Sequence, residues 1–343
     1  MSGPARDLLV VMPSWIGDVV MATPALAALA EQRQDLVIRA VARPGLGPVL
    51  EGLPWLGDVE TATLRGVLGP LGDARRLSRR RPDEVLLLPN SLRSGLFARL
   101  LNSPRRIGYA VQGRGWLLTE AIPFPSGASP APTTTLDDYC GLVEAAFGIR
   151  VADRVPRLGT TPDQEAEADR ILEGIEGPLI LLNPGANRMD KRWSPGNFAE
   201  LADRLRDRYP HSIAVNGSPA ETGILEEVCR RAGPGVVNLS KRGGSLGALK
   251  AVVRKAELMV TNDTGPRHLA AALGTPSVVL FGPTDRRFTV LEGIRERHLV
   301  AEPFLTTDRI ADDHPRACRI DRISVGDVVH AVEELLGGKD GAR

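Results

Sequence analysis

Short apolar runs rich in valine, isoleucine and leucine recur along the chain and end in proline, glycine, asparagine or serine. Helix-length stretches separate many of these runs, a pattern typical of buried parallel strands joined by helices. In the first half the pattern predicts a helix from about Asp18 to Gln32 and strands at Leu8–Met12, Val37–Val41 and Val85–Leu88.

The second half of the chain repeats this plan. It predicts strands at Leu179–Leu182, Ile213–Val215, Leu258–Val260 and Ser277–Phe281, and helices at Pro195–Arg208 and Arg267–Leu273. No sequence motif is repeated between the halves, so only the architecture recurs. The fold class expected is α/β, with two doubly wound parallel-sheet domains.

The boundary between the domains is expected in a polar stretch, residues 159–177, because a complete strand pattern resumes directly after it. The first domain then spans residues 1–160 and the second 161–324, followed by a last segment, 325–343, that begins with a helix. The proline-rich stretch 122–135 is expected to form a surface loop.

Composition narrows the function classes. The 343 residues fit two domains, and 43 basic against 42 acidic side chains do not favour a nucleic-acid partner. Cys140, Cys229 and Cys318 form no closely spaced pair, and no cluster of metal-ligand residues is evident, so neither a metal nor another cofactor is expected. No apolar segment approaches membrane-spanning length, which predicts a soluble, cytoplasmic protein.

The loop after the first strand carries a candidate general base. Asp18 follows Gly17 where a helical apolar pattern begins. A carboxylate there can simply cap the helix, or it can take a proton from a substrate hydroxyl. Neither a dinucleotide-binding glycine motif nor a phosphate-binding Walker sequence is present.

Two loops of the second domain have the chemistry of an anion site. Lys191 and Arg192 precede a helix that Ser194 and Pro195 should start. Cations there favour a bound phosphate, and the alternative is that both are solvated surface charges. After the strand ending at Val260, Thr264 and Gly265 open a helix whose backbone N–H groups could bind phosphate, and His268 lies one turn further on.

The segment from Arg65 to Arg114 holds eleven arginines against three acidic residues. The arginines between Arg75 and Arg81 are expected to form a solvated helix face. Arg93 follows a buried strand on the side of Asp18, so we expect Arg93, together with Arg114, to face an anionic acceptor. The same charge would draw this face to an anionic membrane surface without insertion.

Taken together, the motifs resemble those of glycosyltransferase family 9, the bacterial ADP-heptose:lipopolysaccharide heptosyltransferases, and most closely the heptosyltransferase II group. The motifs follow the family's order over nearly the whole chain: Met12–Met21, Leu88–Ser91, Asn183–Gly185, Lys191–Trp193, Asn262–Gly265 with His268, and Phe281–Thr284. The resemblance implies a GT-B fold, with two Rossmann-like domains facing across a cleft and the last helix returning to the first domain.

The resemblance also implies an inverting, metal-independent transfer of heptose from ADP-heptose to a hydroxyl of the lipopolysaccharide inner core, by an enzyme in peripheral contact with the inner face of the cytoplasmic membrane. It assigns Asp18 as the catalytic base and Lys191 as the lysine at the diphosphate. Donor contacts are expected from Asn183, Gly185, Asn187, Arg192, Asp263, Thr264, Gly265 and His268. Acceptor contacts are expected from Ser14, Gly17, Asn90, Ser91, Arg93 and Arg114.

Two alternatives stay open at this point. A family 9 enzyme using another nucleotide sugar would carry the same motifs, and so would a non-catalytic homologue that binds nucleotide sugars or glycans. The presence of both Asp18 and Lys191 favours an enzyme. Arg267, which follows Pro266, departs from the family pattern and is expected to add a cation close to the phosphates.

Overall fold

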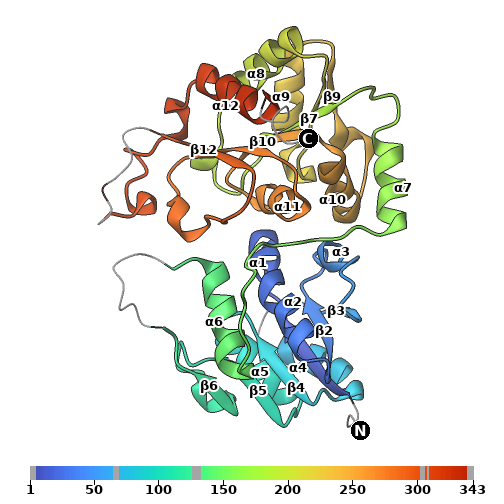
Figure 1. Ribbon diagram of the computed structural model, residues 1–343, viewed down its shortest axis with the longest axis vertical. Helices are drawn as coiled ribbons and strands as arrows, with labels where there is room; N and C mark the ends of the chain where they lie inside the picture. The colour runs from blue at the N-terminus through green and yellow to red at the C-terminus, as the bar shows by residue number, and fades with distance from the viewer. Residues whose placement is uncertain (1–4, 65–68, 126–132, 302–305, 307–308, 338–343) are drawn as a thin grey trace. The chain divides into compact units, whose positions relative to one another are not determined.

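The computed structural model describes residues 5–64, 69–125, 133–301, 306 and 309–337. The chain forms two compact units, Met1–Gly159 and Thr160–Arg343 (Figure 1). The expected boundary after residue 160 lies one residue from this division. Much of the proline-rich stretch, residues 126–132, lies outside the described residues.

The first unit is built on a six-stranded parallel sheet with the order β3-β2-β1-β4-β5-β6. Its central strands are the three that the apolar runs predict. The strands are β1 Arg6–Val11, β2 Leu36–Ala42, β3 Val59–Thr61, β4 Glu84–Leu87, β5 Arg105–Tyr109 and β6 Glu120–Ile122. The sequence pattern did not reveal β3, β5 and β6, which are short or carry arginines.

Helices cover both faces of this sheet. Helices α1 (Ile16–Met21), α2 (Thr23–Gln32) and α6 (Thr135–Phe147) contact one another on one face (Figure 1). Helices α4 (Gly69–Leu77) and α5 (Leu92–Leu100) pack on the other, where alternate residues of β1 and β4 share one apolar core with them. The short helix α3 spans Gly47–Leu50.

The helix predicted from Asp18 to Gln32 is in fact two. It breaks at Ala22, where Pro24 opens α2 and the hydroxyl of Thr23 donates to the carbonyl of Val20 at 2.8 Å. Proline lacks the N–H that a continuous helix needs, so the break follows from the sequence. As a result Asp18 lies in a separate six-residue helix.

The second unit repeats the design with the order β12-β11-β10-β7-β8-β9. Its four predicted strands are again the central ones. The strands are β7 Leu179–Asn183, β8 Ser212–Val215, β9 Val236–Asn238, β10 Leu258–Asn262, β11 Ser277–Phe281 and β12 Glu296–Val300. Together the two sheets establish the α/β, doubly wound architecture expected from the sequence.

Two apolar cores flank the second sheet. One face packs against α8 (Pro195–Arg208), α9 (Thr222–Ala232) and α12 (Val325–Gly337). The other packs against α7 (Pro162–Ile171), α10 (Leu246–Lys255) and α11 (Gly265–Leu273). Helix α7 lies in the stretch that we interpreted only as a polar boundary, although its capping box, Thr161 with Gln164, is readable from the sequence.

The last helix corrects one expectation. Helix α12 was expected to return to the first domain, but it packs on α8, and its Val328 and Val332 are fully buried in the core of the second unit. An ion pair between Arg208 and Glu333 and a hydrogen bond from Arg295 to the carbonyl of Leu335 hold it there. Its apolar face is therefore used within the second unit. Residues 338–343 lie outside the described residues.

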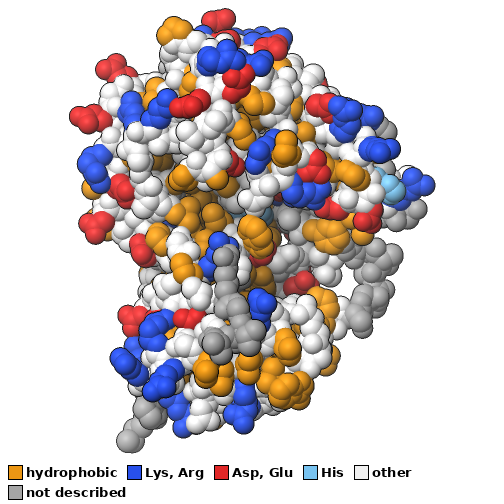
Figure 2. Space-filling model, turned by 180° about the vertical axis from the view of Figure 1, so that it is seen from behind, with side chains coloured by type: hydrophobic (Ala, Val, Ile, Leu, Met, Phe, Trp, Pro, Cys, Tyr) orange, Lys and Arg blue, Asp and Glu red, His pale blue; other side chains and the backbone are white. Residues whose placement is uncertain are grey.

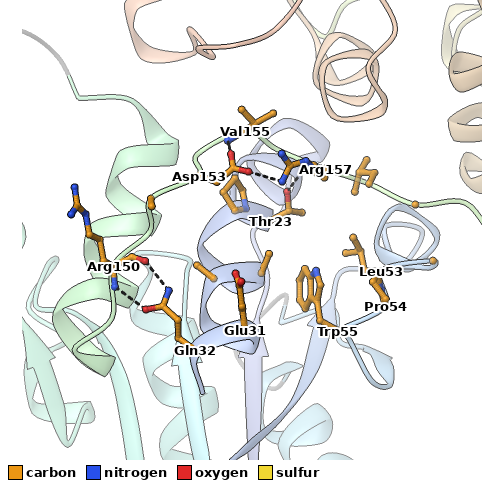
Figure 3. Close-up of a pocket in the computed structure, with 17 residues that line it drawn as sticks. Thr23, Glu31, Gln32, Leu53, Pro54, Trp55, Arg150, Asp153, Val155 and Arg157 are labelled. Atoms are coloured by element: carbon orange, nitrogen blue, oxygen red, sulfur yellow. Dashed lines mark hydrogen bonds and ion pairs between the residues drawn. The ribbon is translucent and has the colours of Figure 1, made fainter. Parts of the chain in front are cut away.

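The end of the first unit is fastened to α2 at two points. Gln32 and Arg150 are joined by a hydrogen bond of 2.8 Å, and the N–H of Arg157 donates to the hydroxyl of Thr23 (Figure 3). A cavity of about 410 Å³, lined in part by Glu31 and Trp55, lies between these points. No residue that the sequence assigned to a site lines this cavity.

Candidate active site

The predicted site residues gather at one point of each sheet. In the first unit they follow β1 and β4, and in the second they follow β7 and β10. In both sheets these two strands are neighbours, and the strand order runs outward from them in opposite directions. Ligands of open α/β sheets bind at such switch points, because the loops there diverge and leave a crevice beyond the strand ends.

At the switch point of the first unit, Asp18 is a half-buried carboxylate. It is the third residue of α1, whose N-cap residue is Trp15, and its side chain makes no capping hydrogen bond. Burial raises the pKa of Asp18 to about 6. Buried Tyr139 on α6 lies close enough for the charge of Asp18 to add to burial in raising the pKa of its phenol. Asp18 thus combines a place in the first turn of α1, where a carboxylate stabilises the helix, with a pKa that suits a base, and its catalytic role stays a prediction.

The predicted acceptor residues around the loop after β4 are of two kinds: some hold the loop in place, and others are exposed. Ser91 caps α5, since its hydroxyl accepts from the N–H of Ser94 at 3.2 Å. Arg114 is fully buried and donates to the carbonyls of Pro89 and Tyr109. Both side chains help to hold this loop in place; Arg114 is withdrawn from solvent, whereas Ser91 is half-buried and its acceptor contact stays a prediction.

Of the other predicted acceptor residues at this switch point, Ser14 and Arg93 are exposed, while Gly17 is buried in α1. Arg93 is the second residue of α5. Asn90 is half-buried, and its side-chain oxygen accepts from Arg114 at 3.0 Å, which leaves its amide N–H₂ as the group free for a ligand. Arg114 is buried without an acidic partner, and burial lowers its pKa to about 10. A guanidinium that no carboxylate neutralises therefore lies beneath this loop.

In the second unit, Asn262 ties the two loops of the switch point together. Its side-chain amide donates to the carbonyls of Pro184 and Gly185, at 2.9 and 3.2 Å, and its oxygen accepts from the N–H of Trp193 at 3.2 Å. The loop after β7 is thereby held against the end of β10. The sequence showed Asn262 as part of a motif but did not indicate this role.

A chain of charges runs from this loop into the core. The ammonium of Lys191 lies 3.7 Å from one carboxylate oxygen of Asp263, and the guanidinium of Arg267 lies 3.0 Å from the other. Arg267 is fully buried and also pairs with Glu296 at 3.0 Å. The expected extra cation at the phosphates is therefore neutralised inside the unit, and Arg267 positions Asp263 instead.

Glu296 completes this buried network. Burial opposes its charged form, but the hydrogen bond from His298 and the charge of Arg267 together hold the pKa of Glu296 at about 2. It is ionised at neutral pH and balances the guanidinium of Arg267.

The loop after β10 leads into α11 with Thr264 as its N-cap residue. The hydroxyl of Thr264 makes no capping bond and donates to the carbonyl of Asn262 at 3.3 Å. Pro266 has no N–H, and the N–H of Arg267 donates to the carbonyl of Thr264 at 3.1 Å, so the N–H of Gly265 is the one left for an anion at the start of α11. His268 is buried, and its Nδ1 has no hydrogen-bond partner in the described part of the chain. Burial and the neighbouring Arg267 lower the pKa of His268 to about 4, so the ring is neutral at pH 7.

The remaining predicted donor residues follow β7. Asn183 ends the strand and is buried, Asn187 is exposed, and Arg192 donates to the carbonyl of Ala186 at 2.8 Å. Gly185 leaves room for the carboxylate of Glu221, since a Cβ atom there would lie 2.0 Å from Oε1 of Glu221 and displace that side chain. Glu221 follows β8 and was not singled out from the sequence.

With this geometry established, comparison with known proteins identifies the family. The model described as "Glycosyltransferase family 9 (heptosyltransferase)" matches residues 73–303. The chain belongs to glycosyltransferase family 9. The match includes every predicted donor residue and the loop after β4.

Individual relatives are similar to this chain in sequence or structure along most of its length. The lipopolysaccharide heptosyltransferase 2 of Salmonella typhimurium is 29% identical over 305 residues, which cover 82% of this chain and 84% of that protein. The structure of a family 9 glycosyl transferase from Veillonella parvula aligns with a TM-score of 0.83 at 21% identity, covering 99% of each chain. That of the E. coli ADP-heptose LPS heptosyltransferase II aligns with a TM-score of 0.81 at 23% identity, covering 98% of this chain and all of the other. These structural matches establish the GT-B fold of this family.

The described residues of this family 9 chain lack two features. None of its helices has both the length and the apolar character needed to cross a bilayer. No group of three or more histidine, cysteine, aspartate or glutamate side chains is arranged to hold a metal ion.

Proposed function

We propose that this family 9 enzyme transfers a heptose from ADP-heptose to a hydroxyl of the lipopolysaccharide inner core, with inversion at the anomeric carbon. The relative from Salmonella is named for lipopolysaccharide, and the E. coli enzyme of known structure for ADP-heptose as well. The observation that carries the proposal is Asp18, an unpaired carboxylate with a pKa of about 6 at the switch point of the first unit.

The donor side of the proposal rests on the second unit. Lys191 and the N-terminus of α11, with the N–H of Gly265, supply positive potential and hydrogen-bond donors for a diphosphate. Glu221 follows the second strand of this Rossmann-like unit, where an acidic side chain commonly accepts hydrogen bonds from ribose hydroxyls. His268, neutral and with Nδ1 unpaired, can hydrogen-bond a sugar or phosphate oxygen.

The chemistry balances with these groups. Asp18 takes the proton of the acceptor hydroxyl while that oxygen attacks the anomeric carbon and the bond to the diphosphate breaks. ADP leaves with the electron pair, and its added negative charge is stabilised by Lys191 and the N-terminus of α11. These residues supply the charge stabilisation without a metal ion, so we propose a metal-independent reaction.

The acceptor is proposed to bind beyond β1 and β4, at Ser14, Gly17, Asn90 and Arg93. The buried charge of Arg114 behind Asn90 favours an anionic acceptor there. We place the enzyme in the cytoplasm, where its three free cysteines suit a reducing compartment.

The test is to incubate the enzyme with ADP-heptose and, separately, with other ADP- and GDP-linked sugars, and to measure nucleotide release with and without a core-sugar acceptor. We expect acceptor-dependent release of ADP from ADP-heptose alone, and a product of opposite anomeric configuration by NMR. Turnover with another nucleotide sugar only, or retention of configuration, would contradict the proposal.

A further inference from the structure

One face of the first unit combines exposed apolar side chains with unpaired arginines. It is formed by α4, α5 and the short helix η2 (Gly115–Leu117), and we name it the α4–α5 face. We propose that this face docks on an anionic lipid bilayer and inserts its apolar side chains at the interface. The inference deepens the proposed function, whose acceptor is carried by a lipid.

The apolar members of the face are large and unusually accessible. Trp116 on η2 is 77% exposed, Leu71 on α4 is 52% exposed, and Leu92 and Leu96 on α5 are 50% and 39% exposed. These four make up half of the eight large hydrophobic side chains that are exposed among the described residues. Exposed apolar groups gathered on one side of a unit mark an interaction surface.

Helical spacing places apolar and basic side chains in the same stripes. On α4 and its continuation, Leu71, Arg75 and Arg79 follow one another at intervals of four residues. On α5, Leu92, Leu96 and Arg99 occupy the outward side, while Phe97 and Ala98 are buried against the sheet. Each stripe therefore presents leucine followed by arginine, the pattern of a helix that lies in a membrane interface.

The three elements lie side by side, so the stripes form one surface. Helices α4 and α5 contact each other, and α5 contacts η2. Gly95 allows α5 and η2 to lie close together, because a Cβ atom at this position would lie 3.0 Å from the side chain of Leu117, the neighbour of Trp116. Figure 2 shows this side of the first unit, with orange side chains gathered beside blue ones.

The positive charge of the face is not neutralised by the protein. Arg75, Arg79, Arg93 and Arg99 are exposed and make no ion pair with the described residues. Arg99 even helps to lower the pKa of Arg106, whose guanidinium donates only to backbone carbonyls. By contrast, exposed arginines of the second unit such as Arg204 and Arg230 pair with carboxylates one helical turn away.

An anionic bilayer satisfies both features of this face at once. Lipid phosphates neutralise the arginines, and the interfacial region accepts leucine and tryptophan side chains. Docking would also place the first turn of α5, with Asn90 and Arg93, at the membrane surface where a lipid-carried acceptor is presented. A nucleic acid would explain only the charge of this face, and a protein partner would explain only its apolar groups.

The first experiment is co-sedimentation of the full-length enzyme with vesicles of phosphatidylethanolamine and phosphatidylglycerol, against vesicles of phosphatidylcholine alone. We expect binding to the anionic vesicles only. The double variant Arg75→Gln/Arg79→Gln should bind about 25-fold more weakly, at about fivefold for each arginine. Leu71→Ser/Leu96→Ser should weaken binding about tenfold without changing its salt dependence.

The matched control is Arg204→Gln/Arg230→Gln, which removes the same charge from the second unit and should bind as the wild type does. Equal loss in this control, or no preference of the wild type for anionic vesicles, would overturn the proposal in favour of a nonspecific or a protein-directed surface. Vesicle binding displaced by a short duplex DNA at equimolar charge would point to a nucleic-acid surface and would overturn it as well.

Insertion has its own measurement. Lipids brominated on their acyl chains should quench the tryptophan fluorescence of the vesicle-bound wild type, and Trp116→Phe should bind with little of that quenching. Unchanged quenching in Trp116→Phe would contradict insertion of this face.

The two proposals fail separately. Asp18→Asn should keep full vesicle binding while losing turnover, and the α4–α5 variants should keep turnover on a soluble core-sugar acceptor. If vesicle binding holds and turnover on ADP-heptose does not, the docking surface stands and the proposed reaction fails.

Discussion

Asp18 shows how a single residue acquires its chemistry from its surroundings. Without a hydrogen-bond partner in the described part of the chain, and half-buried in α1, its carboxyl has a pKa of about 6. A base with that pKa is largely ionised at neutral pH yet still basic enough to accept a proton. The side chain of Asp18 makes no hydrogen bond with the described residues, although its place in the first turn of α1 still favours the helix dipole.

The pKa of Asp18 predicts how kcat/KM depends on pH. A base must be deprotonated to act, so kcat/KM should rise about tenfold per pH unit below pH 6 and level off above it. His268, with a pKa of about 4, adds no second step above pH 5. A pH profile of kcat/KM that is flat between pH 5 and 7 would contradict the role of Asp18.

Replacing the base itself gives a second test. Asp18→Asn keeps the shape and removes the proton-accepting charge, so turnover should fall by roughly 10²–10⁴-fold. Donor affinity and thermal unfolding should stay close to wild type. A variant that keeps more than about a third of wild-type turnover would leave Asp18 without a catalytic role.

The buried cation Arg267 predicts a large effect on stability. Arg267→Leu removes the buried guanidinium that Asp263 and Glu296 share and leaves them only Lys191 and His298, and breaking a buried ion pair costs about 3–5 kcal/mol. Urea unfolding should show this loss, whereas Arg319→Leu, which removes an exposed arginine paired with Asp321, should cost less than about 1 kcal/mol. Equal losses in the free energy of unfolding would mean that the buried network contributes no more than an exposed ion pair.

At the scale of an element, the start of α5 carries one residue expected to stabilise the helix and one expected to bind the acceptor. Ser91→Ala removes the N-cap and should destabilise the protein by about 1 kcal/mol without changing the acceptor KM. Arg93→Ala should do the reverse: raise the acceptor KM and flatten its salt dependence, with donor KM and stability unchanged. Kinetics on a soluble core-sugar acceptor at two ionic strengths would show the difference. An unchanged acceptor KM in Arg93→Ala would remove it from the acceptor site.

Elements also show where sequence patterns work. The central strands β1, β4, β7 and β10 are apolar runs buried on both faces, so the pattern alone revealed them. The short strands β3 and β9 and the arginine-rich strand β5 take their conformation from pairing with a neighbour, which no local pattern records.

At the scale of the whole molecule, the reaction is expected to proceed without a metal ion. In the proposed mechanism Lys191 and the N-terminus of α11 balance the diphosphate charge, so turnover should persist in EDTA. Lys191→Ala should both raise the donor KM and lower kcat, because the contact serves the departing diphosphate even more than the bound donor. Activity lost in EDTA and restored by Mg²⁺ or Mn²⁺ would contradict the metal-free mechanism.

The sequence by itself determined the two α/β units, the strands at their centres and the loops in which the site residues lie, because alternation of apolar runs and helices is a local property. Only the tertiary structure decided the state of individual side chains. Arg114 and Arg267 are charged and were expected at the ligands, yet both are fully buried and serve the scaffold. Burial, partners and pKa depend on residues distant in the chain, and those neighbours exist only once the sheets have formed.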